Sequence, residues 1–264
     1  MIPKIIHYCW FGNTPKPDIV KHCITSWRKY CVGWEIKEWN EANFDVESIP
    51  YMKEAYEQKK YAFVSDVARL LIVYQSGGVY LDTDVELLGS IEPLLENEAF
   101  FAFESNRNIN TGLGFGAISN HKAIKKMLEF YKEKYFVVNN KMCLVPCPAG
   151  NSESLSSLYS AFKRDGQSQQ FSNISILGTS EYSRIAKHHE AGTWLETSKA
   201  VNRKYKDFWI KRFLRAPEKF DFIEKHFNKR IVELYTFFVY DLLEYGVIYY
   251  LKKLLLRRRD KRVK

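Results

Sequence analysis

The stretch SGGVYLDTDVELL, residues 76–88, decides how the rest of this sequence is interpreted. Two glycines open it, an apolar strand follows, and Asp82 and Asp84, two positions apart, come before the chain turns apolar again. In open α/β sheets, ligands bind beyond the carboxyl ends of the strands. Because alternate residues of an extended segment point the same way, both carboxylates can face one side. The pattern predicts a binding site at the end of this strand.

Two carboxylates in this position fit a complex of a divalent cation with a diphosphate. Hard cations take oxygen ligands, commonly one or two carboxylates together with phosphate oxygens. A bound cation neutralises the charge that develops on a nucleoside diphosphate when a sugar leaves it. An arbitrary Asp-x-Asp tripeptide is more often a pair of turn residues, because the tripeptide is common by chance. The glycine pair and the apolar strand make the context here narrower.

Two other functions remain as alternatives. Phosphatases of the haloacid dehalogenase type also carry a strand followed by DxD, with Thr or Val at the fifth position, where this chain has Glu86. We find no later acid pair or lysine that completes their scheme, so this alternative ranks low. A non-catalytic protein that binds sugar nucleotides or glycans is the other, and the intact carboxylates argue against it.

A helix predicted just before this stretch contains a pair of opposite charges. From residue 61 to residue 75 only Asp66 and Arg69 are charged, and they stand at i and i+3, on one face of a helix. An ionised pair in such a helix is costly unless it is satisfied. It is either an internal salt bridge or part of the site mouth, where Asp66 accepts hydrogen bonds from sugar hydroxyls and Arg69 orients the donor or its phosphates.

Strands alternate with helices through the first half of the chain, which favours an α/β fold with a mostly parallel sheet. At 264 residues the chain has room for one sizeable domain with small additions. We expect one nucleotide-binding domain over residues 1–200 and a helical extension over 201–264. The predicted strands are 4–10, 34–39, 79–81, 99–103 and 114–118, and the predicted helices are 19–30, 54–75, 121–135 and 152–162. Residues 164–173 are predicted to be a polar loop.

The charge distribution argues against nucleic acid as a partner. Of the net charge of +9, residues 252–264 carry +7, from eight basic residues and one acid, so the remainder of the chain carries +2. Residues 231–251 are apolar but contain three acids and make a poor membrane span. Together with the basic tail they predict an element lying on anionic lipid. A core helix followed by a solvated tail is the equal alternative.

The cysteines and the first residues bear on the compartment. Five cysteines, an odd number, and the lack of a CxxC pair argue against a disulfide framework or a structural zinc site. The N-terminal residues lack the pattern of a signal peptide. We therefore expect a reducing, cytoplasmic location, with a peripheral position at the inner face of the cell membrane if the tail binds lipid.

Several motifs together resemble family 32 of the glycosyltransferases. The motifs are IPKIIHYCWFG near the N-terminus, SW at 26–27, WNEAN at 39–43, SDVARLLIVYQSGGVYLDTDVELL from residue 65, and HHEAGTW at 188–194. The family is similar to bacterial capsular-polysaccharide sugar transferases and the yeast initiating α-1,6-mannosyltransferase, and more distantly to the glucosyltransferase domain of the large clostridial toxins. This chain departs from the pattern at Thr193, where Ser is usual, and around residues 145–150, where contacts to the acceptor are expected.

The resemblance implies a GT-A fold and a transferase that retains the anomeric configuration. It implies a nucleotide-sugar donor, with UDP expected before GDP, and a glycan or lipid-linked glycan as the acceptor. It also implies bound Mn²⁺ or Mg²⁺ and a role in bacterial capsular or surface polysaccharide synthesis.

The resemblance also assigns metal and sugar contacts. Asp84 is the expected direct metal ligand, Asp82 contacts the metal or the ribose, and His189 supplies a further metal ligand. Asp66 and Arg69 hold the sugar. Surface loop positions are the alternative for the histidines.

The expected donor-binding residues are Trp10, Tyr80, Asn110 and Trp194, together with Asp82. Trp10 would stack on the base, Asn110 would reach the sugar, and Trp194 would close over the diphosphate. Trp10 is otherwise an ordinary core residue, and Asn110 a residue that caps its own loop.

Overall fold

The structure is a computed structural model, and it describes residues 1–104, 108–138, 141–144 and 147–189. All of these lie in one compact unit, Met1–Leu195. The predicted extension over 201–264, with its basic tail, lies outside the described residues, and the predicted domain boundary near residue 200 stays a prediction. Within the described ranges, no helix has the length and apolar character needed to cross a membrane.

A seven-stranded sheet runs through the centre, with the strand order β2-β1-β3-β6-β5-β10-β9. Five of these strands run in one direction, and β6 and β9 run in the other. The predicted α/β fold with a mostly parallel central sheet is therefore confirmed. The strands are β1 (Ile5–Cys9), β2 (Glu35–Trp39), β3 (Gly78–Tyr80), β4 (Val85–Leu87), β5 (Ala99–Ala102), β6 (Phe115–Ala117), β7 (Val137–Val138), β8 (Lys141–Met142), β9 (Gln169–Phe171), β10 (Ile174–Leu177) and β11 (Ala186–His188).

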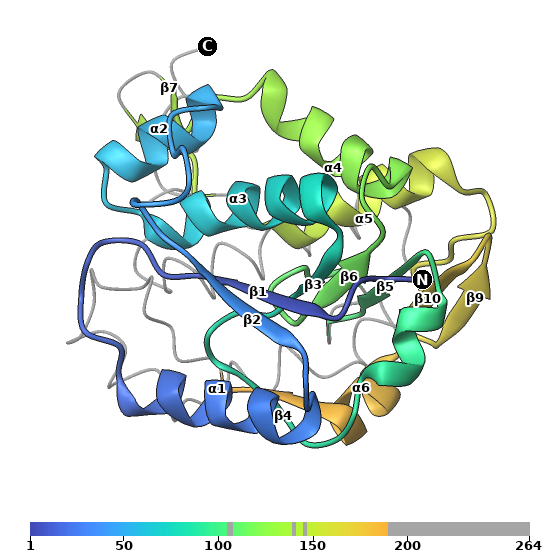
Figure 1. The fold of residues 1–264 in the computed structure, drawn as a ribbon. Coiled ribbons are helices and arrows are strands. Elements are labelled where there is room, and N and C mark those ends of the chain that lie inside the picture. The colour runs from blue at the N-terminus through green and yellow to red at the C-terminus, as the bar shows by residue number, and fades with distance from the viewer. Residues whose placement is uncertain (105–107, 139–140, 145–146, 190–264) are drawn as a thin grey trace, which may run out of the picture. The chain divides into compact units, whose positions relative to one another are not determined.

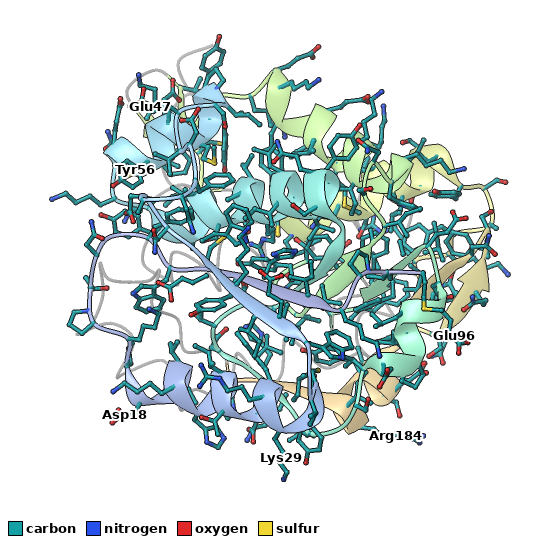
Figure 2. All side chains as sticks on the ribbon, viewed as in Figure 1. Asp18, Lys29, Glu47, Tyr56, Glu96 and Arg184 are labelled. Carbon is teal, nitrogen blue, oxygen red and sulfur yellow. The ribbon has the colours of Figure 1, made fainter. Side chains whose placement is uncertain are left out.

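Helices cover both faces of the sheet. The helices α2, α3, α4 and α5 lie on one face, whereas α1, α6 and the small β4–β11 sheet lie on the other (Figure 1). Charged side chains such as Lys29 of α1 and Arg184 of α6 point away from the sheet (Figure 2). The helices are α1 (Asp18–Tyr30), α2 (Pro50–Glu57), α3 (Tyr61–Ser76), α4 (Lys122–Lys132), α5 (Cys147–Leu158) and α6 (Thr179–Ile185), and a short 3₁₀ helix spans η1 (Glu92–Glu96).

The alternation of side chains along the strands divides the core into two clusters. In β5, Phe101 packs with α3 in one cluster, and its neighbour Phe100 packs with the α1 cluster on the other face. In β1, Ile6 and Tyr8 face the α1 cluster, while Cys9 faces the opposite one. Successive residues of a strand point to opposite faces, so the central strands are apolar on both sides.

The predicted single helix over 54–75 is wrong, because the chain breaks into α2 and α3. Lys59 adopts a left-handed conformation with φ +56. The Lys60 amide then donates to the Ala55 carbonyl, and the Lys59 amide to the Tyr56 carbonyl. These two bonds end α2 as a Schellman motif, which usually carries glycine at the left-handed position. A lysine there gives no local sign of the break.

The predicted loop over 164–173 contains strand β9. This strand pairs antiparallel with β10 through a two-residue turn at Ser172 and Asn173, whose φ values are +46 and +60. Positive φ at both positions suits a tight hairpin, which commonly has Asn-Gly in that place. Because Ser-Asn stands in place of Asn-Gly, the usual hairpin signal is missing from the sequence. The helix predicted from residue 152 also starts earlier, at Cys147.

Candidate active site

The glycine pair lets β3 run directly beside β1. Helix α3 ends at Gly77, with φ +66, and Gly78 follows with φ +100. A Cβ atom on Gly78 would lie 2.8 Å from Nε2 of His7 and 2.9 Å from the carbonyl oxygen of Ile5. Only glycine accepts both the positive φ and this close approach. The strand that leads to the two aspartates is therefore fixed at its start.

A buried histidine secures the same turn. Nε1 of Trp39 donates to Nδ1 of His7 at 3.1 Å, so Nε2 of His7 carries the proton and donates to the Gly77 carbonyl at 2.9 Å. Burial lowers the pKa of His7, although the Gly77 hydrogen bond opposes the shift. The neutral imidazole thus ties β1, β2 and the end of α3 together.

Strand β4, which follows the aspartates, is held along both edges. On one edge it pairs antiparallel with β11. On the other, side chains of α1 satisfy its backbone: Nε1 of Trp27 donates to the Val85 carbonyl at 2.7 Å, and the Leu87 amide donates to Oγ of Ser26 at 2.9 Å. Asp82 and Asp84 therefore lie between two anchored strands, β3 and β4.

Asp82, Asp84 and His188 form a group that is suited to a metal ion. One ligand atom from each residue lies within 4.8 Å of the others, and all three side chains are half-buried. Nε2 of His188 is 3.2 Å from Oδ1 of Asp84. Two carboxylate oxygens and an imidazole nitrogen are ligands that Mn²⁺ accepts.

Arg69 lies next to this group and links the predicted Asp66–Arg69 pair to the pair of aspartates, Asp82 and Asp84. It forms an ion pair with Asp66, and its Nη1 lies 3.4 Å from Oδ1 of Asp82. Its Nε donates to the Ser65 carbonyl at 3.1 Å. The Arg69 side chain is 4% exposed. The salt-bridge alternative for Asp66 and Arg69 is thus present, and the same pair also contacts the carboxylate cluster.

Burial and pairing act against each other on these groups. Burial raises the pKa of Asp82, and the positive charge of Arg69 only partly offsets this. Burial would lower the pKa of Arg69, but the charge of Asp82, together with smaller contributions from Cys147, Tyr80 and Tyr131, outweighs it and the pKa rises. Arg69 is therefore a permanent positive charge beside Asp82.

The loop after β5 approaches the Asp82 carboxylate closely at Gly112. A Cβ atom on Gly112 would lie 2.4 Å from Oδ2 of Asp82, 2.9 Å from Nη1 of Arg69 and 3.0 Å from Oδ1 of Asn110. The Asp82 amide donates to the Gly112 carbonyl at 3.4 Å. Sequence reasoning missed Gly112. The only sign in the sequence that Gly112 belongs to the site is its position two residues after Asn110, which was predicted to bind the donor.

Asn110 caps its own loop. Its Oδ1 accepts from the Gly112 amide at 2.7 Å, and its Nδ2 donates to Oε1 of Glu104 at 3.0 Å. This is the loop-capping arrangement that stood as the alternative to a sugar contact. The side chain nonetheless lies next to Gly112, at the edge of the carboxylate cluster.

The other predicted donor-binding residues lie in different surroundings. Trp10 is half-buried at the end of β1, where its amide donates to the Trp39 carbonyl at 2.8 Å and its Nε1 to the Thr14 carbonyl at 2.7 Å. Tyr80 is 1% exposed, and its hydroxyl hydrogen-bonds to Asp82. It therefore supports Asp82 from behind and offers no open face to a donor. Trp194 lies outside the described residues.

The predicted metal ligand His189 lies elsewhere, and His188 takes its place. Nε2 of His189 is 2.8 Å from Oε2 of Glu86. Adjacent residues of an extended chain point in opposite directions, and β11 is extended up to His188. The two histidines therefore diverge, one toward Asp84 and the other toward Glu86. The sequence identified the pair, but not which member joins the aspartates.

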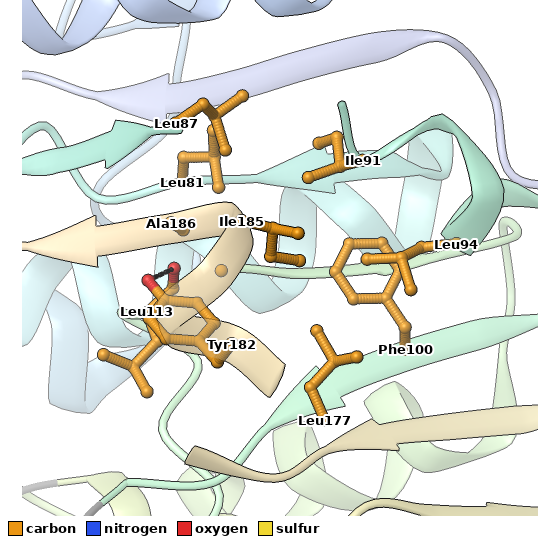
Figure 3. Close-up of a pocket in the computed structure, with 11 residues that line it drawn as sticks. Leu81, Leu87, Ile91, Leu94, Phe100, Leu113, Leu177, Tyr182, Ile185 and Ala186 are labelled. Carbon is orange, nitrogen blue, oxygen red and sulfur yellow. Dashed lines mark hydrogen bonds between the residues drawn. The ribbon is translucent and has the colours of Figure 1, made fainter. Parts of the chain in front are cut away.

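An apolar pocket lies beneath β4 and β11, beside the site. Its lining includes Leu81, Phe100, Leu113, Tyr182 and Ile185, and contains no charged side chain (Figure 3). The Tyr182 hydroxyl donates to the Leu113 carbonyl at 2.7 Å. Because the pocket offers no charged group to a diphosphate, it belongs to the core packing and not to the donor site.

Part of this chain is similar to known glycosyltransferases. Residues 17–101 match the family model described as the glycosyltransferase sugar-binding region containing the DXD motif. Inositol phosphoceramide mannosyltransferase 3 of Schizosaccharomyces pombe is 34% identical over 120 residues, covering 43% of this chain and 33% of that protein. Human alpha-1,4-N-acetylglucosaminyltransferase is 38% identical over 71 residues, covering 27% of this chain and 19% of that protein.

The matched part of these relatives is limited. The chain spans about a third of the length of the first and about a fifth of the second. Among solved structures, the PaToxG glycosyltransferase superposes with a TM-score of 0.45 and 15% identity, over 61% of this chain and 70% of that one.

Proposed function

We propose that this protein is a metal-dependent glycosyltransferase, because residues 17–101 match the model of the glycosyltransferase sugar-binding region containing the DXD motif. It moves a sugar from a nucleotide-sugar donor to a glycan acceptor. The observation that carries the proposal is the convergence of Asp82, Asp84 and His188 at the end of β3, with Arg69 paired to Asp82 behind them. Binding beyond the carboxyl end of a sheet strand is where this type of fold places its ligands.

The three converging residues fit a divalent cation, and their mixed oxygen and nitrogen donors favour Mn²⁺ over Mg²⁺, which prefers oxygen alone. A cation bound there supplies positive charge to offset the charge that grows on the leaving diphosphate.

The protein's own charges complete the site. Arg69 fixes the position of the Asp82 carboxylate, and its charge is shared between Asp66 and Asp82. The Asp66 carboxylate accepts hydrogen bonds from the sugar hydroxyls, and Trp10 stacks on the base. The acceptor oxygen bonds to the anomeric carbon on the face that the diphosphate leaves, so the configuration is retained, and the hydroxyl proton departs with the diphosphate.

A UDP-sugar is the favoured donor, and a glycan or lipid-linked glycan of a bacterial capsular or surface polysaccharide is the favoured acceptor. The proposed location is the cytoplasm or the inner face of the cell membrane, supported by the cysteine usage and the basic tail. The relatives are named for mannose and for N-acetylglucosamine transfer, so they support more than one sugar.

The test is release of nucleoside diphosphate from a panel of UDP- and GDP-sugars, with Mn²⁺ or with EDTA. One donor should be turned over by the wild type with Mn²⁺ and not with EDTA, and Asp84→Ala should abolish this turnover. Asp18→Ala, which removes a fully exposed carboxylate on α1, is the matched control and should behave like the wild type. A protein that gains thermal stability from a donor and Mn²⁺ but releases no diphosphate is a binding protein, and the proposal would then be rejected.

A further inference from the structure

A second acidic group stands next to the carboxylate cluster and is held by two imidazoles. Nε2 of His22 lies 3.0 Å from Oε1 of Glu86, and Nε2 of His189 lies 2.8 Å from Oε2 of the same carboxylate. The two rings meet edge to face, with centroids 6.4 Å apart. The three residues come from α1, β4 and the segment just after β11. Glu86 therefore joins three parts of the chain through one side chain.

This contact lies one residue away from the histidine of the proposed metal site. His189 follows His188 directly, and its amide donates to the Asp84 carbonyl at 2.9 Å. The side chain of His189 is fixed by Glu86, while that of His188 points to Asp84. Holding one member of an extended pair fixes the direction of the other, because their side chains must diverge.

Glu86 is well placed to act as a fixed anchor. Its neighbours Val85 and Leu87 are buried and bound to α1 through Trp27 and Ser26. The same helix supplies His22 one turn earlier. The position of Glu86 is thus fixed by its own strand and by α1, and Glu86 in turn fixes the side chain of His189.

We propose that Glu86, held by His22 and His189, is a positioning residue that orients His188 toward Asp82 and Asp84 and thereby sets the affinity for the divalent cation. The proposal rests on the proposed function, since it assumes that these three residues bind a metal. Groups that orient metal ligands from outside the first coordination sphere commonly change metal affinity by about 10–100-fold when they are mutated.

The test measures Mn²⁺ binding directly, without turnover. Glu86→Gln keeps the size of the side chain but leaves a single oxygen to accept from two imidazoles. We expect its Kd for Mn²⁺, measured by calorimetry, to rise about ten-fold. His22→Ala should have a smaller effect, because His189 remains paired. Glu47→Gln, which breaks the exposed pair with Lys53, is the matched control and should bind as the wild type does.

A spectroscopic measurement separates positioning from general stability. Pulsed electron paramagnetic resonance of bound Mn²⁺ should show modulation from an imidazole nitrogen in the wild type, and this signal should weaken in Glu86→Gln. If Glu86→Gln melts earlier but keeps the wild-type Kd and nitrogen signal, Glu86 is only a structural clamp and the inference is overturned. If the wild type itself binds no more Mn²⁺ than Asp84→Ala, the proposed metal-dependent function fails first, and the inference fails with it.

Discussion

His188 and Asp84 meet across the two-stranded β4–β11 sheet, with Nε2 of the imidazole 3.2 Å from Oδ1 of the carboxylate. The next residue, His189, turns to Glu86 instead. Two adjacent histidines thus contact two different carboxylates: Asp84, just before β4, and Glu86, within it. These contacts bring the end of the described chain to Asp84 and Glu86, more than one hundred residues earlier in the sequence.

This divergence predicts unequal effects of the two histidines. His188→Ala removes a proposed ligand and should weaken Mn²⁺ binding more than any other single histidine change. His189→Ala removes only the support from Glu86 and should raise the Kd by about ten-fold. Calorimetric titration with Mn²⁺ compares the two. A larger loss in His189→Ala than in His188→Ala would restore His189 as the ligand.

Gly112→Ala should disable the site without unfolding the protein. The added methyl would lie 2.4 Å from Oδ2 of Asp82, so the carboxylate must shift. A displacement of about 1 Å at reacting groups can lower the rate about 100-fold. Gly89→Ala is the control, because its Cβ would meet no atom closer than 4.0 Å. The measurement is the rate of donor turnover of both variants. Equal rates would contradict the prediction and would mean that the loop moves to make room for the methyl group.

Arg69→Ala should be strongly destabilising as well as inactive. It leaves the carboxylates of Asp66 and Asp82 close together and without their shared partner. Removing one member of a buried ion pair costs about 3–5 kcal/mol. Lys53→Ala, which breaks an exposed pair, should leave the free energy of unfolding almost unchanged. Urea unfolding measures both, and similar values would mean that the Arg69 charge is screened by water.

The protein should lose stability in mild acid through two buried histidines. Burial lowers the pKa of His7 and of His121, so both are neutral when folded. The unfolded chain binds protons below its usual pKa of about 6.5, and the folded chain does so only at lower pH. The free energy of unfolding should therefore be constant well above pH 6.5, fall as the pH drops from about 6.5 through the lowered folded pKa values, and level off below them.

A substitution at the start of α4 tests this pH dependence. The side chain of His121 caps α4 by accepting from the Ala123 amide at 3.3 Å. Asparagine is a good N-cap and does not titrate, so His121→Asn should keep the stability at neutral pH and flatten its decline in acid. Urea unfolding from pH 7.5 to 5 would show the difference between the two proteins. Parallel curves would mean that His121 contributes nothing to the acid sensitivity.

Most of the fold follows from local patterns in the sequence. The apolar runs and the turn residues predicted the central strands, and the glycine pair marked the end of α3. The prediction failed where an unusual residue takes a left-handed conformation. Lys59 ends α2, and Ser172 with Asn173 forms the β9–β10 turn. All three residues are exposed and none of them is glycine, the residue that usually marks such a position, so the sequence carries no clear sign of these turns.

Part of the site was predicted correctly, because four of its residues are close together in the sequence. Asp82, Asp84, Asp66 and Arg69 lie within one helix–turn–strand segment, so the spacing of residues in helices and strands was enough to place them near one another. Tyr80 was predicted to bind the donor, but the alternation of side chains along a strand does not tell which face of the strand is packed against the core. The buried hydroxyl of Tyr80 contacts Asp82 from the core side.

By itself, the sequence determined the strand that ends in paired carboxylates and the charged helix before it, because helix and strand periodicity act over a few residues. Only the tertiary structure decided that His188 and not His189 joins the aspartates, that Gly112 lies against Asp82, and that Glu86 is held by His22 and His189. These contacts join residues that are distant in the chain. They depend on the register of β11 against β4 and on the docking of α1, which no local pattern encodes.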